Sequence, residues 1–322
     1  MSLSGNDDPR WLGNLEWDDH HSVPMIVYYN QKGGIGKTTN LHAHGRSMAQ
    51  SFGLRVMAAD LDSQRNMTYD MCGDRIRNYQ GGEGQPGFYK NWINRRNANQ
   101  AVVARTLKQM LEPLYGQQST TTLADVELEQ IEVEGAGELW VLCGDEDITE
   151  LDNKINTATV MLETLPTLKN YLAAPYYAIM KAAKKCRAQV VLLDLSPSNG
   201  NLNKVMTLTS SHIVIPMTLD IKSLEGLVSI CERLTDGSSS GWCHWGHFEG
   251  VRKTSDCTFT FPTRRPKFLG WTLNNYNVNK RGERVDCVRQ DRLARNDEGF
   301  FQRICGAVTH CVVAVAKLCV SI

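Results

Sequence analysis

Short runs of apolar and β-branched residues recur along the chain and are separated by longer segments of mixed polarity. The four clearest runs are residues 23–29, 54–59, 189–193 and 211–215. Helix-length segments include residues 36–51, 173–187 and 219–234. Strands that are apolar on both faces are typical of a parallel sheet covered by helices on each side. The pattern therefore predicts an α/β fold with a doubly wound, mostly parallel sheet, and residues 139–143 and 267–273 are predicted to add two strands.

Polar and glycine-rich stretches interrupt this pattern. Residues 1–22 are rich in Asp, Gly and Asn, and we expect them to form a flexible N-terminal extension. Insertions are predicted near residues 78–120 and 235–264, which contain the loop-like sequences GGEGQPG and GSSSG. No insertion is long enough to form a domain of its own, and there is no repeat of solenoid period. We therefore expect a single domain over residues 23–322.

Composition places the chain among ordinary soluble globular proteins. Of its 322 residues, 42% are hydrophobic and 22% are charged, which excludes wholesale disorder and a collagen-like chain. The ten cysteines form no CxxC pair, and this usage favours a reduced, cytoplasmic protein. The apolar tail at residues 308–322 is shorter than the roughly 20 residues that cross a bilayer. A membrane is therefore not expected as a partner.

The phosphate loop is the strongest local signal in the sequence. Residues 30–39 read NQKGGIGKTT, directly after the first apolar run and before a helix-compatible segment. In a P-loop, glycines let backbone N–H groups converge on phosphate oxygens, a lysine neutralises charge on the β- and γ-phosphates, and a hydroxyl ligates Mg²⁺. Here Gly33, Gly34 and Gly36 form the turn, Lys37 is the phosphate lysine and Thr38 is the Mg²⁺ ligand. Gln31 stands where the strict pattern has Gly, and the loop contains a second lysine, Lys32.

Acidic residues follow two of the predicted strands. Asp60 and Asp62 come just after the run at 54–59, and Asp194 comes directly after the run at 189–193. A nucleotide-bound Mg²⁺ needs outer carboxylates, and hydrolysis needs a polarised water. The sequence therefore predicts that these acids face the phosphate loop.

Taken together, these motifs resemble the ParA/MinD-type deviant Walker ATPases, and within them the ParA (Soj-like) partition branch. The motifs occur in the family's order: QKGGIGKTT at 31–39, DLDSQ at 60–64, VLCGDED at 141–147, LLDLSPSNG at 192–200 and IPMTLDIKSLEGL at 215–227. The resemblance covers residues 23 to about 279, and the chain beyond about residue 281 is hard to align. It implies a P-loop ATPase with ATP and Mg²⁺ as cofactors.

The resemblance also implies roles for individual residues. Lys32 is similar to the signature lysine that reaches the partner's phosphates in a nucleotide-sandwich homodimer. Asp62 resembles the residue that orients the attacking water, which makes Lys32, Lys37 and Asp62 the candidate catalytic residues. Thr38, Asp60 and Asp194 are the candidate metal residues. The candidate nucleotide contacts are Gly33, Gly34, Ile35, Gly36, Lys37, Thr38, Thr39, Asn275 and Asn277.

This sequence departs from the family pattern at several positions. Ser63 and Ser196 stand where the family usually has proline, and Asn277 stands where an acid is common in the adenine-side turn. Cys243, His244, His247 and Cys257 lie close together in sequence, but their spacing matches no paired-ligand pattern for zinc. We do not predict a metal site there.

Charge is unevenly distributed although the chain has no net charge. Residues 251–322 hold thirteen Lys and Arg against six Asp and Glu, about +7. The basic residues concerned include Arg264, Arg265, Lys267, Lys280, Arg281, Arg284, Arg289, Arg292 and Arg295. Such a run is usually a solvated face, but with the family resemblance it predicts nonspecific contact with DNA phosphates.

The resulting hypothesis is a cytoplasmic, nucleoid-associated ATP hydrolase that acts in DNA partition or cargo positioning. The resemblance implies an ATP-dependent homodimer and slow hydrolysis stimulated by a ParB-like activator protein. Two alternatives remain open from the residues: a MinD-like ATPase that cycles on a membrane, and a nucleotide-gated regulatory protein whose hydrolysis is vestigial.

Overall fold

A computed structural model describes most of the chain between residues 23 and 274. It describes residues 23–79, 87–96, 103–116, 122–161, 168–218, 220, 222–223, 225–227, 230, 258–259 and 266–274. Seven strands form one sheet in the order β3-β4-β2-β5-β1-β6-β7. Their bounds are β1 (Met25–Tyr28), β2 (Arg55–Leu61), β3 (Glu129–Ile131), β4 (Glu138–Leu142), β5 (Val190–Leu195), β6 (His212–Thr218) and β7 (Lys267–Asn274). All neighbouring strands are parallel except β3 and β4, so the predicted fold class is confirmed.

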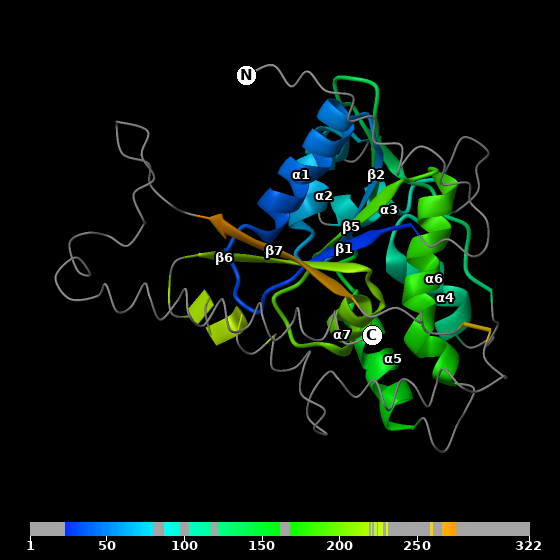
Figure 1. The fold of residues 1–322 in the computed structure, drawn as a ribbon. Helices are drawn as coiled ribbons and strands as arrows, with labels where there is room; N and C mark the ends of the chain where they lie inside the picture. Colours follow the sequence, from blue (N-terminus) through cyan, green and yellow to red (C-terminus); the bar gives the residue numbers. More distant parts are fainter. Residues whose placement is uncertain are drawn as a thin grey trace, which may run out of the picture.

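Helices cover both faces of this sheet (Figure 1). On one face lie α1 (Lys37–Phe52), α2 (Asn66–Arg77) and α3 (Phe88–Ile93). On the other face lie α4 (Leu107–Tyr115), α5 (Thr149–Val160), α6 (Lys169–Lys185) and α7 (Asn201–Thr209). The sheet is therefore the middle layer of three, as a doubly wound fold requires.

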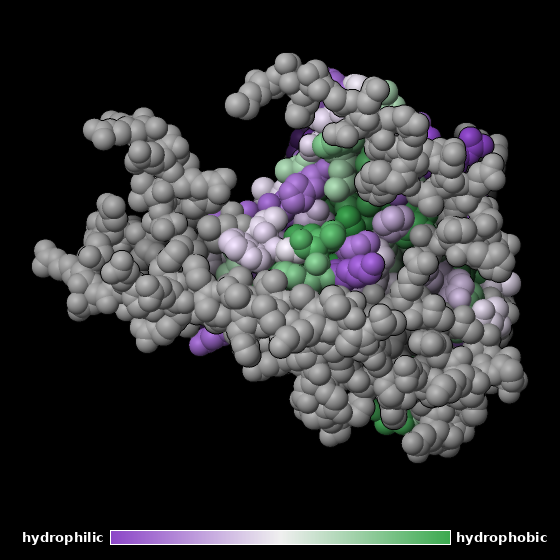
Figure 2. Space-filling model, viewed as in Figure 1, coloured by the Kyte–Doolittle hydropathy of each residue, from purple (hydrophilic) through white to green (hydrophobic). Residues whose placement is uncertain are grey.

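Alternation of side chains along each strand builds two separate cores. In β1, Met25 and Val27 belong to the core beneath α4–α7, whereas Ile26 and Tyr28 belong to the core beneath α1–α3. Because both faces are covered, consecutive strand residues are buried, and this explains the continuous apolar runs in the sequence. Figure 2 shows hydrophobic residues gathered near the middle of the view, where the strands of the sheet cross in Figure 1.

All six strands predicted from the sequence are present, with shifted ends. β2 and β5 each run two residues beyond the predicted end, so Asp60 and Asp194 lie within strands rather than after them. The predicted helices at 36–51 and 173–187 correspond to α1 and α6. The segment predicted as an insertion near 78–120 contains α3 and α4. The helix predicted at 219–234 lies partly outside the described residues.

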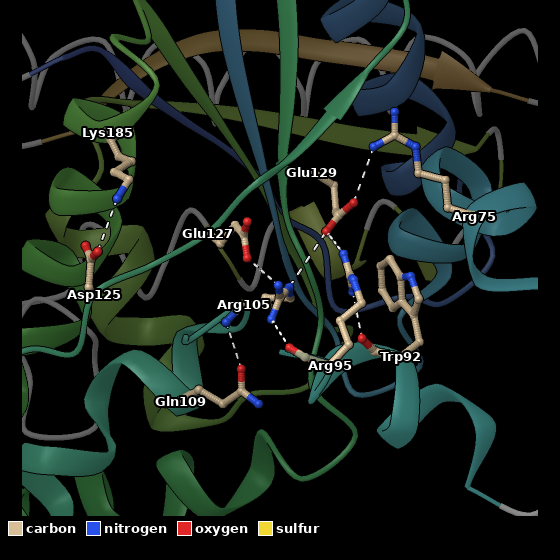
Figure 3. Close-up of polar contacts among 9 residues, drawn as sticks. All are labelled: Arg75, Trp92, Arg95, Arg105, Gln109, Asp125, Glu127, Glu129 and Lys185. Atoms are coloured by element: carbon tan, nitrogen blue, oxygen red, sulfur yellow. Dashed lines mark hydrogen bonds and ion pairs between the residues drawn. The ribbon is translucent and has the colours of Figure 1, made fainter. Parts of the chain in front are cut away.

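The edge strand β3 was not predicted, and a buried ion-pair network holds it in place (Figure 3). Glu129 of β3 pairs with Arg95, which follows α3, and with Nη1 of Arg75 from α2 at 3.3 Å. Arg105, whose side chain is 2% exposed, pairs with Glu127, and its Nη1 donates to the Arg95 carbonyl oxygen at 2.7 Å. The network joins α2, the end of α3 and β3, so charged residues contribute to this edge together with the buried Ile131.

The helices described in the structure include none with the length and apolar character needed to cross a membrane.

Candidate nucleotide-binding site

The loop at residues 30–36 connects β1 to α1 and leaves its backbone accessible. Gly34 and Gly36 have φ angles of 68° and 81°, in the left-handed region that favours glycine. An added Cβ at Gly33 or Gly34 would meet no atom within 4 Å. Gly36 is also the N-cap of α1, whose first N–H groups lack partners within the helix. The loop and helix end together form a backbone cradle for an anion such as phosphate.

Two asparagines that are not among the candidate site residues hold the ends of this loop. Asn30 is buried: its Nδ2 donates to the Pro216 carbonyl at 2.8 Å, and its Oδ1 accepts from the Lys32 N–H at 3.2 Å. Asn274, the last residue of β7, donates from Nδ2 to the Ile35 carbonyl at 2.6 Å. The loop is thus attached to two further strands, β6 and β7. These roles depend on which strands the fold places near the loop, so no local pattern signals them.

Lys37 lies at the base of the loop, largely buried. Its Nζ donates to the Lys32 carbonyl at 3.2 Å. Burial lowers the pKa of Lys37, while the nearby carboxylates of Asp194 and Asp62 oppose that shift. A buried ammonium group beneath an open anion cradle is suited to neutralising phosphate charge.

Thr38 and Asp194 form the feature that best fits a metal ion. The Thr38 hydroxyl donates to Oδ2 of Asp194 at 2.7 Å, and the other oxygen, Oδ1, is buried without a hydrogen-bond partner. Burial raises the pKa of Asp194, and the charge of Asp60 raises it further, to about 8. A threonine hydroxyl and a carboxylate with a spare oxygen are hard oxygen groups of the kind that Mg²⁺ prefers. The residues present therefore fit a Mg²⁺ ion at the end of the phosphate loop.

Asp60 is differently placed from Asp194, although the two are register partners on neighbouring strands. Its Oδ2 accepts from the Thr68 N–H at 2.8 Å and from the Thr68 hydroxyl at 2.7 Å, and its Oδ1 accepts from the Asp62 N–H at 3.2 Å. Burial raises its pKa to about 6. Both oxygens of Asp60 already have protein partners in the first turn of α2 and at Asp62, so its contact with a metal stays a prediction.

Asp62 follows β2 and begins the turn that leads into α2. Its Oδ1 accepts from the Gln64 N–H at 3.0 Å, and its carbonyl accepts from the Arg65 N–H at 2.9 Å. This turn holds Asp62 near Lys37, on which its charge acts. The structure thus brings five predicted residues together at the carboxyl ends of the central strands: Lys37, Thr38, Asp60, Asp62 and Asp194.

The Lys32 side chain contacts the end of β6 and the residues that follow it. Its Nζ forms an ion pair with Asp220 and donates to the Thr218 hydroxyl at 3.1 Å. Burial alone would raise the pKa of Asp220, but hydrogen bonds from Lys32 and Thr218 outweigh it and lower that pKa to about 2. Nearly a third of the Lys32 side chain is exposed, so its role across a dimer stays a prediction.

Several predicted residues lie outside the described part of the chain. These are Asn275, Asn277, Cys243, His244, His247, Cys257 and all of the basic residues beyond residue 260 except Lys267. Within the described residues, no group of three or more His, Cys, Asp or Glu side chains is arranged to hold a metal ion. Thr39 is exposed and lies on α1, next to Thr38.

The chain is similar to several solved structures. Protein DIP2308 from Corynebacterium diphtheriae is 18% identical, with a TM-score of 0.58 over 89% of this chain and 88% of that one. A variant of McdA from Cyanothece, in complex with ATP, is 12% identical, with a TM-score of 0.47 over 92% and 80%. The pNOB8 ParA bound to nonspecific DNA is 15% identical, with a TM-score of 0.44 over 78% and 68%. The first of these likenesses shows a shared fold.

Family comparison gives a more direct result, although none of the curated proteins compared with the chain matches it. The model of the AAA_31 family, described as an AAA domain, matches residues 23–238. The matched region begins just before β1 and contains the phosphate loop, both acidic strands and β6. Because this match spans about two thirds of the chain, the protein belongs to the AAA_31 family, whose domain is of the ParA/MinD type.

Proposed function

We propose that this protein binds ATP with Mg²⁺ at the loop of residues 30–39, hydrolyses it slowly, and uses the cycle to position DNA or another cargo. The observation that carries the proposal is the Thr38–Asp194 pair, with its spare buried carboxylate oxygen, beside an open phosphate cradle. A loop that bound phosphate without a metal would not need this acidic partner at its threonine.

The chain's own residues would divide the chemistry as follows. Backbone N–H groups of the loop and Lys37 bind the phosphates, and Thr38 with Asp194 holds the metal. The Mg²⁺ ion, when bound, neutralises charge on the phosphate oxygens. Asp62, fixed by its bond to the Gln64 N–H, orients the attacking water. Catalysis then rests on positioning and charge neutralisation rather than on a covalent intermediate.

Dimerisation is the second part of the proposal. Lys32 is partly exposed and sits at the start of the loop, where it could exchange its pairing with Asp220 for the phosphates of a nucleotide in a second copy. An ATP-dependent homodimer would then be the form that binds DNA, nonspecifically, through the basic residues beyond residue 260. A ParB-like activator would accelerate hydrolysis and return the monomer.

ATP turnover by the wild-type chain and by Asp62→Ala tests the enzymatic part. We expect both proteins to bind ATP with similar affinity in a calorimetric titration, because the phosphate cradle is unchanged. Turnover should fall at least about tenfold in Asp62→Ala, since the water loses its orienting carboxylate. Equal turnover in the two proteins would refute the role of Asp62, and no turnover by the wild type, with or without DNA, would favour a nucleotide-gated regulatory protein.

DNA binding has its own test, in which Arg264, Arg265 and Lys267 are together changed to Glu. Removing the positive charges that face DNA phosphates should weaken binding to every DNA sequence alike. The slope of log affinity against log salt should become shallower by about 0.9 for each phosphate that is no longer neutralised on duplex DNA. ATP-dependent dimerisation, followed by light scattering, controls for misfolding. If affinity and slope do not change, the same test moves to the basic residues at 280–295, and binding to vesicles of anionic lipid tests the membrane alternative.

A further inference from the structure

Arg65 has an unusual backbone conformation at the end of the turn formed by residues 62–65, which we call the Asp62 turn. Its φ of 57° and ψ of 29° place it in the left-handed region, where a residue with a side chain is uncommon. It is the N-cap residue of α2, and its carbonyl accepts from the Tyr69 N–H at 3.0 Å. Glycine would adopt this conformation without strain. The presence of arginine here indicates that its side chain does something that glycine cannot.

That side chain is held on two sides by the segments around α3 and β4. Nη1 of Arg65 pairs with Oε2 of Glu146 at 2.8 Å, and the guanidinium carbon lies 4.5 Å above the centre of the Tyr89 ring. The Tyr89 hydroxyl donates in turn to the Gly144 carbonyl at 2.6 Å. Planar guanidinium groups favour such simultaneous pairing and stacking, so the position of Arg65 is fixed from outside its own turn.

The same segment contacts the acidic end of β2. The Gly144 N–H donates to the Thr68 hydroxyl at 2.8 Å, and that hydroxyl donates to Asp60. An added Cβ at Gly144 would lie 2.9 Å from Cγ of Arg65 and 3.0 Å from Cγ of Asp60. Arg65, Thr68 and Asp60 are therefore packed against one backbone segment, and the turn that holds Asp62 lies between Asp60 and Arg65 in the chain.

Glu146 also faces a cavity at the surface. The cavity has a volume of about 240 Å³ and is lined by Tyr89, Lys90, Glu146 and Asp147, among other residues of α3, α4 and the segment after β4. Lys90 pairs with the second oxygen of Glu146 at 2.7 Å. The carboxylate that holds Arg65 is thus shared between the Asp62 turn and this cavity wall.

We propose that Arg65 is a positioning residue for ATP hydrolysis, which holds the Asp62 turn through Glu146 and Tyr89. The inference rests on the proposed function, because the reaction that it serves is the one proposed for Asp62. Breaking the Arg65–Glu146 pair should let the turn move and displace the Asp62 carboxylate. The phosphate loop is a separate segment between β1 and α1, and it should bind ATP as before.

Two variants and one matched control test this inference. Arg65→Gly keeps the left-handed backbone and removes only the side chain, and Glu146→Gln removes the charge that holds it. Glu150→Gln is the control, because Glu150 pairs with Lys108, a residue that lines the same cavity, at 2.9 Å. We expect kcat to fall about tenfold in the first two variants, with the affinity for ATP unchanged and the control at the wild-type rate. The double variant, which carries Arg65→Gly and Glu146→Gln, should have a kcat no lower than that of the slower single variant, because both substitutions break the same Arg65–Glu146 pair.

Hydrogen exchange provides a readout that does not depend on activity. The N–H groups of Gln64, Arg65, Thr68 and Tyr69 are all bonded within the turn or to Asp60. Exchange of a peptide covering residues 62–69 should accelerate in Arg65→Gly and Glu146→Gln but not in Glu150→Gln, while α6 stays protected in all three. Unchanged exchange, or faster exchange with an unchanged kcat, would overturn the inference. If the wild type shows no turnover, the proposed function fails, while exchange still decides whether Glu146 restrains the turn.

Discussion

Replacing Asp194 by Asn should stabilise the nucleotide-free protein, and increasingly so as the pH rises. Asp194 is buried, only one of its oxygens has a partner, and its pKa rises from 3.8 to about 8. A carboxyl group with a raised pKa in the folded state costs stability as the pH rises from its unfolded value to its folded value. Asn is neutral throughout this range and has nearly the same shape.

The magnitude follows from the size of the shift. Each pKa unit corresponds to about 1.4 kcal/mol, so the cost of Asp194 is roughly 2 kcal/mol at pH 5 and roughly 4 kcal/mol at pH 7. The free energy of unfolding of Asp194→Asn should exceed that of the wild type by amounts of this order. The gain should disappear only below about pH 3, where the carboxyl group is largely protonated in both states.

Urea denaturation followed by tryptophan fluorescence, at pH 5 and pH 7 without nucleotide or Mg²⁺, measures this difference. Asp125→Asn is the matched control, because Asp125 pairs with Lys185 at 3.1 Å on the surface and more than half of its side chain is exposed. An exposed pair of this kind contributes about 1 kcal/mol or less. If Asp194→Asn shows the same pH dependence as the wild type, burial does not raise the pKa of Asp194 in the folded protein, and the reasoning about its stability is refuted.

Three further changes have definite expected outcomes. Asp194→Asn should also weaken the Mg²⁺ dependence of ATP binding, measured by calorimetry with and without the metal; an unchanged dependence would place the metal elsewhere. Lys37→Ala should abolish ATP binding in the same titration, because the β- and γ-phosphate charge loses its lysine, and retained tight binding would contradict the loop assignment. Glu129→Gln should destabilise the fold by about 3 kcal/mol in urea, since the remaining guanidinium groups would lose their shared carboxylate. A decrease of less than about 1 kcal/mol would show that the edge of the sheet does not depend on this network.

The fold and the centre of the site could be predicted from the sequence because both depend on local pattern. Buried parallel strands appear as apolar runs, and the phosphate loop is a contiguous motif, so β1, α1 and the roles suggested for Lys37 and Thr38 could be read directly. Parallel strands end together, so the sequence predicts that Asp60 and Asp194 lie near each other, and the two are register partners on β2 and β5. Their unequal environments could not be predicted, because the Thr68 bonds to Asp60 come from the following helix.

The unpredicted features depend on contacts between distant segments. β3 has three residues, and its buried Glu129 pairs with arginines from three other segments. Asn30 and Asn274 are ordinary polar residues until β6 and β7 lie near the loop. The sequence alone gives no reason to expect Arg65 to be held in place. Only its φ angle and its ion pair with Glu146 indicate the positioning role proposed for it.

The attachment of Asn274 to the phosphate loop limits how far the following chain can extend from the nucleotide site. Asn274 bonds to the Ile35 carbonyl and to Nδ2 of Asn40, so the end of β7 lies against the loop itself. Lys280 comes six residues later in the sequence, and six residues of extended chain span at most about 22 Å. The first lysine after β7 is therefore tethered within that radius of Asn274. Any displacement of the loop that moves Asn274 would move the point from which the basic residues at 280–295 extend by the same amount.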